Sequence, residues 1–221
     1  MPVLTKRISA IASLVQKGSR VADIGADHGR LSIYLRQHGI AKSVIATDLR
    51  QKPLQNAVKN ITAAGVGGID TRLCDGFDKI CPDEIDTAVI AGMGGEVIAG
   101  IIDRASFVAQ NKIKLVLQPM SSAEALREYL LSNGFFIDTE LTVEEEGKVY
   151  TVISAVFDGI KRKKDLFYLY AGERDFTTDE AKIYVKNLYN RLMGERPAFE
   201  KSDKKDEYAL LCERLYNISI G

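Results

Sequence analysis

Several short segments of the chain combine glycine with a carboxylate, and the first follows an apolar stretch that contains Asp23. The turn after that stretch consists of Gly25, Ala26, Asp27, His28 and Gly29. In open parallel sheets a ligand binds beyond the carboxyl end of a strand, and glycine lets the backbone approach it closely. A dinucleotide site would favour glycine where Asp27 stands, and Asp23 would repel a pyrophosphate. The segment suits a ligand with an ammonium group, such as S-adenosylmethionine; a tight turn that binds no ligand is the alternative.

A second carboxylate, Asp48, lies at the end of the next apolar run, 23 residues after Gly25. An acidic side chain at this place can accept hydrogen bonds from both ribose hydroxyls of an adenosine cofactor. We therefore predict that Asp48 and the adjacent Leu49 belong to the cofactor site. The alternative is that Asp48 caps the amino end of the helix that follows.

Two further glycine-containing segments follow the third and fourth predicted strands. Asp75 and Gly76 could hydrogen-bond the adenine of the cofactor. The later segment would border the transferable methyl group, and it consists of Gly92, Met93, Gly94 and Gly95. Such a turn can also serve only to start a helix at Glu96.

Cysteine, histidine and proline usage narrows the chemistry. The three cysteines form no C-x-x-C pair and there are only two histidines, so we expect reduced thiols and no metal site. Cys74 and Cys81 could suggest covalent attack on a pyrimidine carbon, but isolated cysteines are mostly inert core residues. The sequence has no Asn/Asp-Pro-Pro-aromatic segment after the fourth strand, which argues against an exocyclic amino group as the target.

Short apolar runs alternate with helical stretches after Gly18, which predicts βαβ units and a parallel sheet. Helices are expected over residues 30–37, 54–65, 96–103 and 123–132. Strands are expected over residues 20–25, 43–47, 70–74, 87–91, 113–118, 135–144 and 149–157. The last two are separated by Glu146 and Gly147, which favours a hairpin. The prediction is an α/β fold with a seven-stranded, mostly parallel sheet.

The amino-terminal stretch is basic, but its apolar residues recur at helical spacing. These residues are Leu4, Ile8, Ile11 and Val15. We interpret the stretch as a docking helix, not as a targeting segment. No run approaches the roughly 20 apolar residues that span a bilayer, so we expect no membrane association.

The character of the sequence changes near residue 160, so we predict two domains, residues 1–160 and residues 161–221. Two apolar stripes at helical spacing follow the boundary. They consist of Ala181, Val185, Leu188 and Leu192, and of Tyr208, Leu211, Leu215 and Ile218. The stretch between them, residues 194–205, contains Pro197 and many charges. The simplest arrangement is an antiparallel helix pair joined by a turn over that stretch.

Composition is typical of a globular protein, with 46% hydrophobic and 27% charged residues among 221. The formal net charge is zero, so no basic excess indicates a nucleic-acid partner. Phosphate contacts would have to come from local clusters, and the candidates are Lys6, Arg7, Lys161, Arg162, Lys163 and Lys164. Each of these could equally be a solvated surface residue.

Taken together, the segments resemble the bacterial tRNA (adenine 22-N1)-methyltransferase family in order and spacing. The matching segments are Asp23-Ile24-Gly25-Ala26-Asp27-His28-Gly29, Ala46-Thr47-Asp48, Cys74-Asp75-Gly76, Gly92-Met93-Gly94-Gly95 and Leu117-Gln118-Pro119-Met120. The Asp-His pair, the Gly-Met-Gly-Gly segment and the Gln-Pro-Met segment are the specific parts. At Leu31-Ser32 many members are expected to have Leu-Pro, a departure expected to matter little.

The resemblance implies a Rossmann-like class I methyltransferase domain with a helical carboxyl-terminal domain, S-adenosylmethionine as cofactor and tRNA as partner. It assigns cofactor contacts to Asp23, Gly25, His28, Asp48, Asp75, Gly76 and Gly92, and a target-base pocket to Met93, Gly94, Gly95, Gln118 and Pro119. Gln118 or the backbone near Gly94 would read the adenine edge.

The three scattered cysteines, expected to be reduced thiols, favour a cytoplasmic location. The oligomeric state stays open, with a monomer preferred. Two alternatives remain at this point. One is a methyltransferase that acts on a small molecule. The other is a non-catalytic RNA-binding protein that retains the fold.

Overall fold

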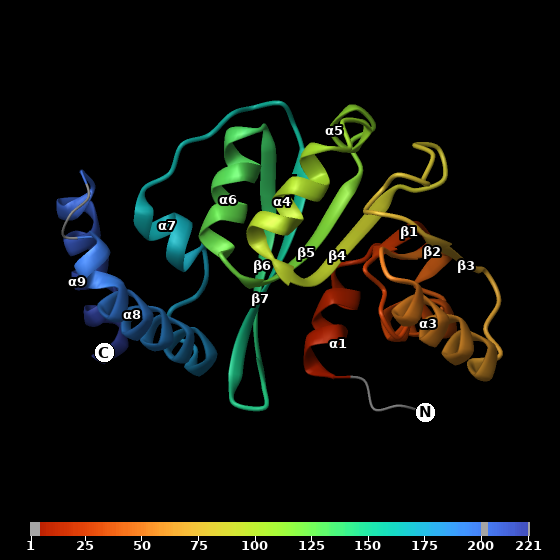
Figure 1. The fold of residues 1–221 in the computed structure, drawn as a ribbon. Helices are drawn as coiled ribbons and strands as arrows, with labels where there is room; N and C mark the ends of the chain where they lie inside the picture. The colour runs from red at the N-terminus through yellow and green to blue at the C-terminus, as the bar shows by residue number, and fades with distance from the viewer. Residues whose placement is uncertain (1–4, 200–202, 221) are drawn as a thin grey trace.

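A seven-stranded sheet lies at the centre of the molecule (Figure 1). The computed structural model describes residues 5–199 and 203–220. The strands are β1 (Ser19–Ile24), β2 (Ala41–Asp48), β3 (Ile69–Leu73), β4 (Thr87–Gly94), β5 (Lys114–Ser121), β6 (Phe135–Glu145) and β7 (Lys148–Phe157). Their order is β3-β2-β1-β4-β5-β7-β6, and β7 pairs antiparallel with both β5 and β6. The predicted seven-stranded, mostly parallel sheet and its terminal hairpin are confirmed.

Helices cover both faces of the sheet because the central strands are apolar on both sides. On one face lie α4 (Gly95–Asp103), α5 (Phe107–Gln110) and α6 (Ala123–Ser132). On the other lie α1 (Lys6–Ser13) and α2 (Arg30–Gln37), with α3 (Gln51–Ala64) beside α2. Alternation along β1 shows the division, since Ala22 and Ile24 pack in the first layer and Val21 in the second. The four-residue α5 was not predicted, because it is too short to show a helical period.

The amino-terminal docking helix is α1, and it is attached to the β6–β7 hairpin. The Thr5 hydroxyl caps α1 by accepting the backbone N–H of Ile8 at 3.3 Å. Lys6 Nζ lies 2.9 Å from Glu144 Oε2, and the backbone N–H of Arg7 donates to Glu145 at 2.8 Å. Leu4, the first residue of the predicted apolar stripe, lies outside the described residues.

Three helices follow the sheet: α7 (Leu166–Ala171), α8 (Asp179–Phe199) and α9 (Lys205–Ile220). The predicted stripes pack together, with Val185 and Leu192 of α8 and Leu211 and Leu215 of α9 buried in one cluster. The predicted turn over residues 194–205 is too long, because α8 continues to Phe199. Pro197 lies in the last turn of that helix, so the chain stays helical past the proline, although the proline removes one backbone hydrogen bond.

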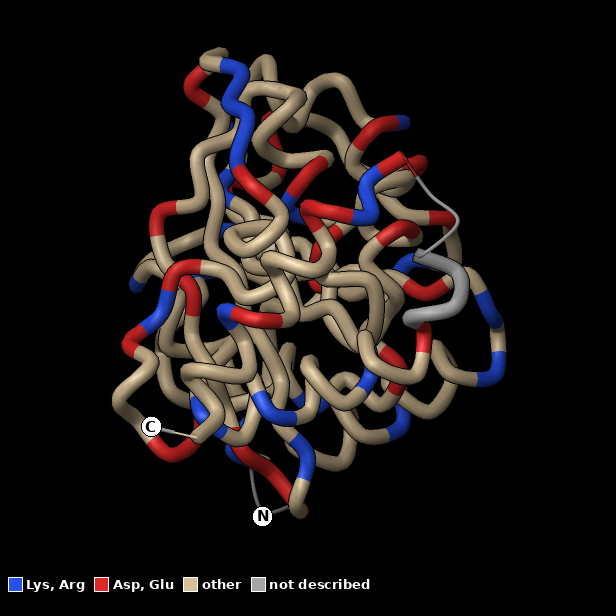
Figure 2. The backbone as a smooth tube through the Cα atoms, turned by 90° about the vertical axis from the view of Figure 1, so that its left-hand side faces the viewer, with Lys and Arg blue, Asp and Glu red and all other residues tan. Residues whose placement is uncertain are grey.

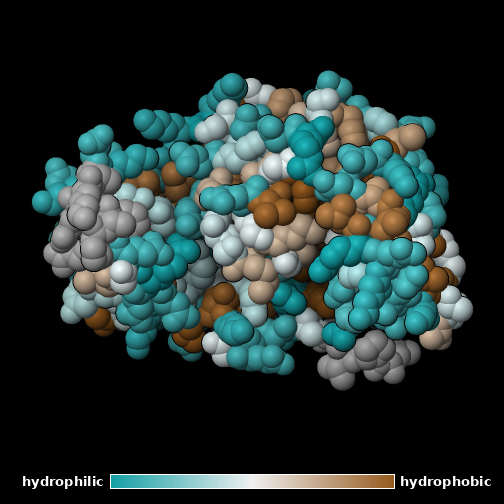
Figure 3. All heavy atoms as spheres, in the orientation of Figure 1, coloured by the Kyte–Doolittle hydropathy of each residue, from teal (hydrophilic) through white to brown (hydrophobic). Residues whose placement is uncertain are grey.

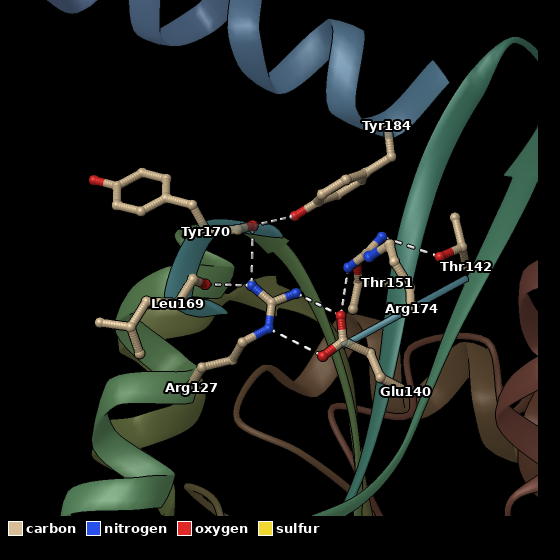
Figure 4. A network of polar contacts seen from close by, with 8 residues as sticks. All are labelled: Arg127, Glu140, Thr142, Thr151, Leu169, Tyr170, Arg174 and Tyr184. Atoms are coloured by element: carbon tan, nitrogen blue, oxygen red, sulfur yellow. Dashed lines mark hydrogen bonds and ion pairs between the residues drawn. The ribbon is translucent and has the colours of Figure 1, made fainter. Parts of the chain in front are cut away.

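A buried ion-pair network joins these helices to the sheet (Figure 4). Arg127 of α6 holds the Glu140 carboxylate of β6 with two hydrogen bonds, of 2.6 and 3.0 Å. It also donates to the carbonyl oxygens of Leu169 and Tyr170 in α7. Arg174, in the segment between α7 and α8, pairs with the same carboxylate. One carboxylate therefore links the sheet, α6 and the carboxyl-terminal segment.

The network also fixes the start of α8. The Tyr184 hydroxyl donates to the Tyr170 carbonyl at 2.9 Å, and the Arg174 guanidinium lies 3.8 Å from the centre of the Tyr184 ring. Gly172 has φ of +73°, and a β-carbon there would lie 2.2 Å from a Glu140 oxygen. Glycine is therefore required for the chain to pass the carboxylate this closely.

Candidate active site

A cavity of about 910 Å³ opens at the carboxyl ends of the parallel strands, where β1 and β4 are adjacent. The strand order reverses there, because successive strands lead outward through β2 on one side and through β5 on the other. Such switch points bind ligands in α/β sheets. Residues from all four predicted strand-end segments line the cavity. The predicted ones among them are Arg7, Asp23, Gly25, Asp27, His28, Asp48, Leu49, Asp75, Gly76, Gly92, Met93 and Gln118.

The first turn has the tight geometry that its glycines predict. The backbone N–H groups of Gly25 and Ala26 both donate to the Thr47 carbonyl, at 2.9 and 2.8 Å. Gly25 has φ of +75°, and a β-carbon there would lie 2.2 Å from Met93 Cε. The Gly92-Met93-Gly94 segment was predicted to follow the fourth strand, but β4 continues to Gly94, with register shifts on both sides of Met93. Gly25 therefore lets the Met93 side chain at the end of β4 lie against the first turn. Gly29 does not line the cavity; a β-carbon there would lie 3.3 Å from Ala57 Cβ of α3.

Asp23 is the most deeply placed carboxylate of the cavity wall. Asp23 is only 5% exposed, and its Oδ2 accepts a 2.6 Å hydrogen bond from the Ser32 hydroxyl. Burial raises the pKa of Asp23 to about 6, and the hydrogen bond from Ser32 offsets part of that rise. Ser32 stands where the resemblance led us to expect proline, which has no hydroxyl to donate. The departure expected to matter little thus has a specific partner in the site.

Asp48 is also buried, and its Oδ1 accepts the backbone N–H of Arg50 at 2.8 Å. The N-cap position of α3 is occupied by Arg50, so the alternative that Asp48 is the N-cap is wrong. The hydrogen bond instead closes a short turn that holds the carboxylate at the cavity. Asp27 and His28 are more exposed, with the His28 Nε2 atom 3.5 Å from Asp27 Oδ2.

The wall formed by α4 contains residues that the sequence did not predict. Arg104 donates to Asp75 Oδ1 at 3.0 Å, so the two elements that flank the cavity are linked by an ion pair. Glu96, Gly100 and Arg104 line the cavity at spacings of four, which is one face of a helix. The spacing is visible in the sequence, but the sequence does not show which face of α4 is turned to the cavity.

Gln118 is 1% exposed and its amide is occupied by backbone groups. Its Oε1 accepts the Gly92 N–H at 3.2 Å, and its Nε2 donates to the Pro119 carbonyl at 2.9 Å. It therefore supports the end of β4 that contains Met93, and the assignment of Gln118 to the adenine edge stays a prediction. Three other predicted base-pocket residues, Gly94, Gly95 and Pro119, do not line the cavity.

Those three residues have other surroundings. A β-carbon on Gly95 would lie 2.1 Å from the Ser122 carbonyl, so this glycine allows α4 to start against the loop before α6. A β-carbon on Gly94 would lie 3.2 Å from the Ser121 hydroxyl oxygen, which is a less severe contact. Pro119 lines a neighbouring groove that is described below.

The predicted basic residues separate into two groups. Arg7 lines the cavity, and Lys6 is paired with Glu144 beside it. The stretch of Lys161, Arg162, Lys163 and Lys164 follows β7, whose end lies at the amino ends of the parallel strands, away from the cavity. Figure 2 shows this basic run at the top of the view, with the hairpin tip at the bottom. Arg162 is paired with Asp158 and lies over the Phe136 ring.

Exposed apolar side chains border the cavity. Leu49, Val97 and Met120 line it, and Val97 is 55% exposed. Figure 3 shows hydrophobic atoms gathered over α4, the helix that carries Val97. Apolar groups at the mouth of a polar cavity are suited to the flat face of a base.

The described part of the chain contains no group of three or more His, Cys, Asp or Glu residues that could hold a metal ion. No helix within residues 5–199 or 203–220 is long and apolar enough to cross a membrane. Cys74 is buried on the cavity wall, whereas Cys81 is exposed and does not line it.

Comparison with known proteins identifies similar chains. Residues 4–153 match the family model of a methyltransferase domain. The tRNA (adenine(22)-N(1))-methyltransferase of Bacillus subtilis is 33% identical over 165 residues, which cover 71% of this chain and 69% of that protein.

Crystal structures of similar proteins have the same fold over the whole chain. That of the Bacillus subtilis m1A22 tRNA methyltransferase is 26% identical with a TM-score of 0.81, covering 99% of this chain and 100% of that one. That of Streptococcus pneumoniae Sp1610 in complex with S-adenosyl-L-methionine is 28% identical with a TM-score of 0.81, covering 98% and 100%.

Proposed function

Because the chain belongs to the tRNA (adenine 22-N1)-methyltransferase family, we infer that it transfers a methyl group from S-adenosylmethionine to N1 of adenine 22 in tRNA. The observation that carries this inference is the cavity itself. It collects the carboxylates Asp23, Asp48 and Asp75, among others, and the Gly25 turn at the carboxyl ends of the strands, directly beside Gly92 and Met93 at the end of β4. The same arrangement would be unnecessary in a protein that only binds RNA.

The residues of the cavity fit S-adenosylmethionine. The volume of the cavity, about 910 Å³, lies within the roughly 300–1,000 Å³ typical of small-molecule sites. Asp23 supplies a carboxylate for the ammonium group, Asp48 for the ribose hydroxyls and Asp75 for the adenine. Gly25 has no side chain, so Met93 can lie directly against the first turn at the cavity wall. We propose cofactor contacts also for Asp27, His28, Leu49, Gly76 and Gly92, and an indirect role, through helix packing, for Gly29.

The reaction depends on positioning of the reactants more than on acid–base chemistry. S-adenosylmethionine supplies an electrophilic methyl group on a positively charged sulfur. Adenine N1 has an in-plane lone pair and no proton, so no side chain must remove a proton before attack. The chain must hold the base in line and exclude water, which accounts for a site built from turns and apolar groups.

The target base must leave its stack to reach the cavity. Met93 lies on the cavity wall, and Leu49, Val97 and Met120 line the same cavity with exposed side chains. We propose that these apolar groups receive the base. Gln118 then acts as a positioning residue through Gly92, and Gly94, Gly95 and Pro119 shape the wall behind it.

We propose that residues 1–160 form the methyltransferase domain and residues 161–221 a helical domain that helps to bind tRNA. Among the six predicted basic residues, Arg7 is the one that lines the cavity, so we propose it as a phosphate contact. A tRNA substrate is consistent with a cytoplasmic location. We also propose a monomer as the functional state.

Methyl transfer to unmodified tRNA tests the function. Labelled S-adenosylmethionine, purified chain and a transcript with adenine at position 22 should give N1-methyladenosine on nucleoside analysis. A transcript with guanine at position 22 is the matched control and should accept no methyl group. Cofactor binding without transfer to either transcript would instead support a small-molecule methyltransferase.

A further inference from the structure

A second groove, of about 460 Å³, opens beside the active-site cavity. It lies between the β6–β7 hairpin, the loop before α6 and the first half of α8. We call it the flanking groove and define it by Met120, Lys148, Tyr150, Tyr184, Asn187 and Arg191. None of these residues has a role in the cofactor site described above except Met120, which lines both spaces.

The two spaces share a wall. Arg7 lines the cavity, and its guanidinium donates to Met120 Sδ at 3.2 Å. The same guanidinium lies 5.1 Å from the centre of the Tyr150 ring in the flanking groove. A ligand that fills the cavity and continues past Met120 and Arg7 therefore enters the flanking groove.

The groove has the chemistry that binds a single unstacked nucleotide. Tyr150 offers an aromatic ring, Asn187 an amide, and Lys148 and Arg191 positive charge. The only carboxylate on its wall, among the described residues, is Glu124, which is 3.3 Å from Arg191. Two cations against one carboxylate leave a net charge of +1. Lys148 forms no ion pair with any of the described residues.

The groove is also held in a fixed shape. Tyr184 stacks on Arg174 and donates to the Tyr170 carbonyl, so the buried network of Figure 4 supports one wall. The hairpin forms the opposite wall and is tied to α1 through Lys6 and Glu144. A preformed groove lowers the ordering cost of binding.

We propose that the flanking groove binds a nucleotide next to the adenosine that is methylated, with its base on Tyr150 and its phosphate between Lys148 and Arg191. This rests on the proposed function, because an adenosine can enter the cavity only if the adjoining backbone is held beside it. The groove would thus keep the target strand open while the base is in the cavity.

Steady-state kinetics with full-length tRNA test the proposal. Lys148→Ala and Arg191→Ala are each expected to raise KM for tRNA about tenfold, with kcat and the Kd for S-adenosylmethionine unchanged. Lys148→Ala should also reduce the salt dependence of binding by about one unit of slope. Lys186→Ala, on the same helix as Arg191 but outside the groove, is the matched control and should leave KM unchanged.

Tyr150 separates stacking from hydrogen bonding. Tyr150→Phe is expected to retain tRNA affinity, and Tyr150→Leu to lose about tenfold, because only the aromatic face is needed. Equal KM values for Tyr150→Leu, Lys148→Ala and the unaltered enzyme would overturn the proposal while leaving the proposed function intact.

Photochemical crosslinking fixes the location. A benzophenone amino acid at position 150 of the cofactor-loaded enzyme should crosslink to a nucleotide within two positions of adenine 22. Crosslinks confined to distant parts of the tRNA would overturn the proposal. An unaltered enzyme that transfers no methyl group to tRNA would overturn the proposed function, and this inference with it.

Discussion

Asp23 determines how the site responds to pH. The carboxyl is buried beside Ser32, and burial raises its pKa to about 6, compared with roughly 3.9 in an unfolded chain. A carboxyl whose pKa rises on folding binds its proton more tightly in the folded state. Without cofactor, Asp23 therefore disfavours the folded state as pH rises from about 4 through 6. A bound ammonium group would compensate the charge.

Cofactor affinity should consequently depend on pH. Below pH 6 the Kd for S-adenosylmethionine is expected to rise about tenfold per pH unit, because Asp23 must lose its proton to pair with the ammonium group. Calorimetric titrations between pH 4.5 and 8 would measure this. Asp23→Asn should bind more weakly at neutral pH and show little pH dependence, so a variant with the same profile as the unaltered enzyme would exclude Asp23 from this role.

Gly25 should affect cofactor affinity for a different reason. Gly25→Ala adds a methyl group 2.2 Å from Met93 Cε at a backbone φ of +75°, so it strains the first turn and displaces the end of the Met93 side chain at the cavity wall. We expect the Kd for S-adenosylmethionine to rise at least tenfold, measured by calorimetry.

The matched control is Gly39→Ala, where φ is +60° and the added carbon meets nothing within 4 Å. It carries the same backbone strain, of order 1 kcal/mol, without the clash. Its cofactor affinity should be unchanged. If both variants lost affinity equally, strain alone would explain the loss and the clash with Met93 would be irrelevant.

At the scale of the elements, strands and long helices were predictable because their residues repeat at the periods of a sheet or a helix. The helix over residues 30–37 and that over 123–132 agree with α2 and α6 at both ends. The six-residue α7 was missed because it is shorter than two helical turns. Strand-end residues such as Asp48 were also predictable, because the apolar run that predicts the strand shows where the strand ends.

Contacts between distant elements were not predictable in this way. Arg127 and Arg174 appear in the sequence as ordinary charged residues of a helix and a loop, yet both reach Glu140. Gln118 was predicted to lie at the site, but its partner, the Gly92 N–H, depends on the pairing of β4 with β5. Periodicity gives the elements; which side chains meet depends on how the elements pack.

The buried network should make a large contribution to stability. Glu140→Ala would leave Arg127 and Arg174 buried without their shared carboxylate, and breaking a buried ion pair costs about 3–5 kcal/mol. Denaturant unfolding should show this loss. Glu146→Ala, at the exposed hairpin tip, is the control and should unfold like the unaltered protein. A loss below about 1 kcal/mol would show that the network is not needed to hold α7 and α8 on the sheet.

At the scale of the whole molecule, the active-site cavity, the flanking groove and α1 all lie at the carboxyl ends of the parallel strands. The basic run at residues 161–164 lies at the other end. The molecule is neutral overall, so substrate binding must depend on where its charges are placed and not on their sum. This arrangement explains how a chain without a basic excess can act on an RNA.

The central claim is that one atom, N1 of adenine 22, attacks the methyl group. A full-length tRNA with 1-deazaadenosine at position 22 lacks only that nitrogen. We predict that it binds the cofactor-loaded enzyme and competes with unmodified tRNA, yet accepts no labelled methyl group. Methyl incorporation into this tRNA at the rate of the unmodified one would contradict the account.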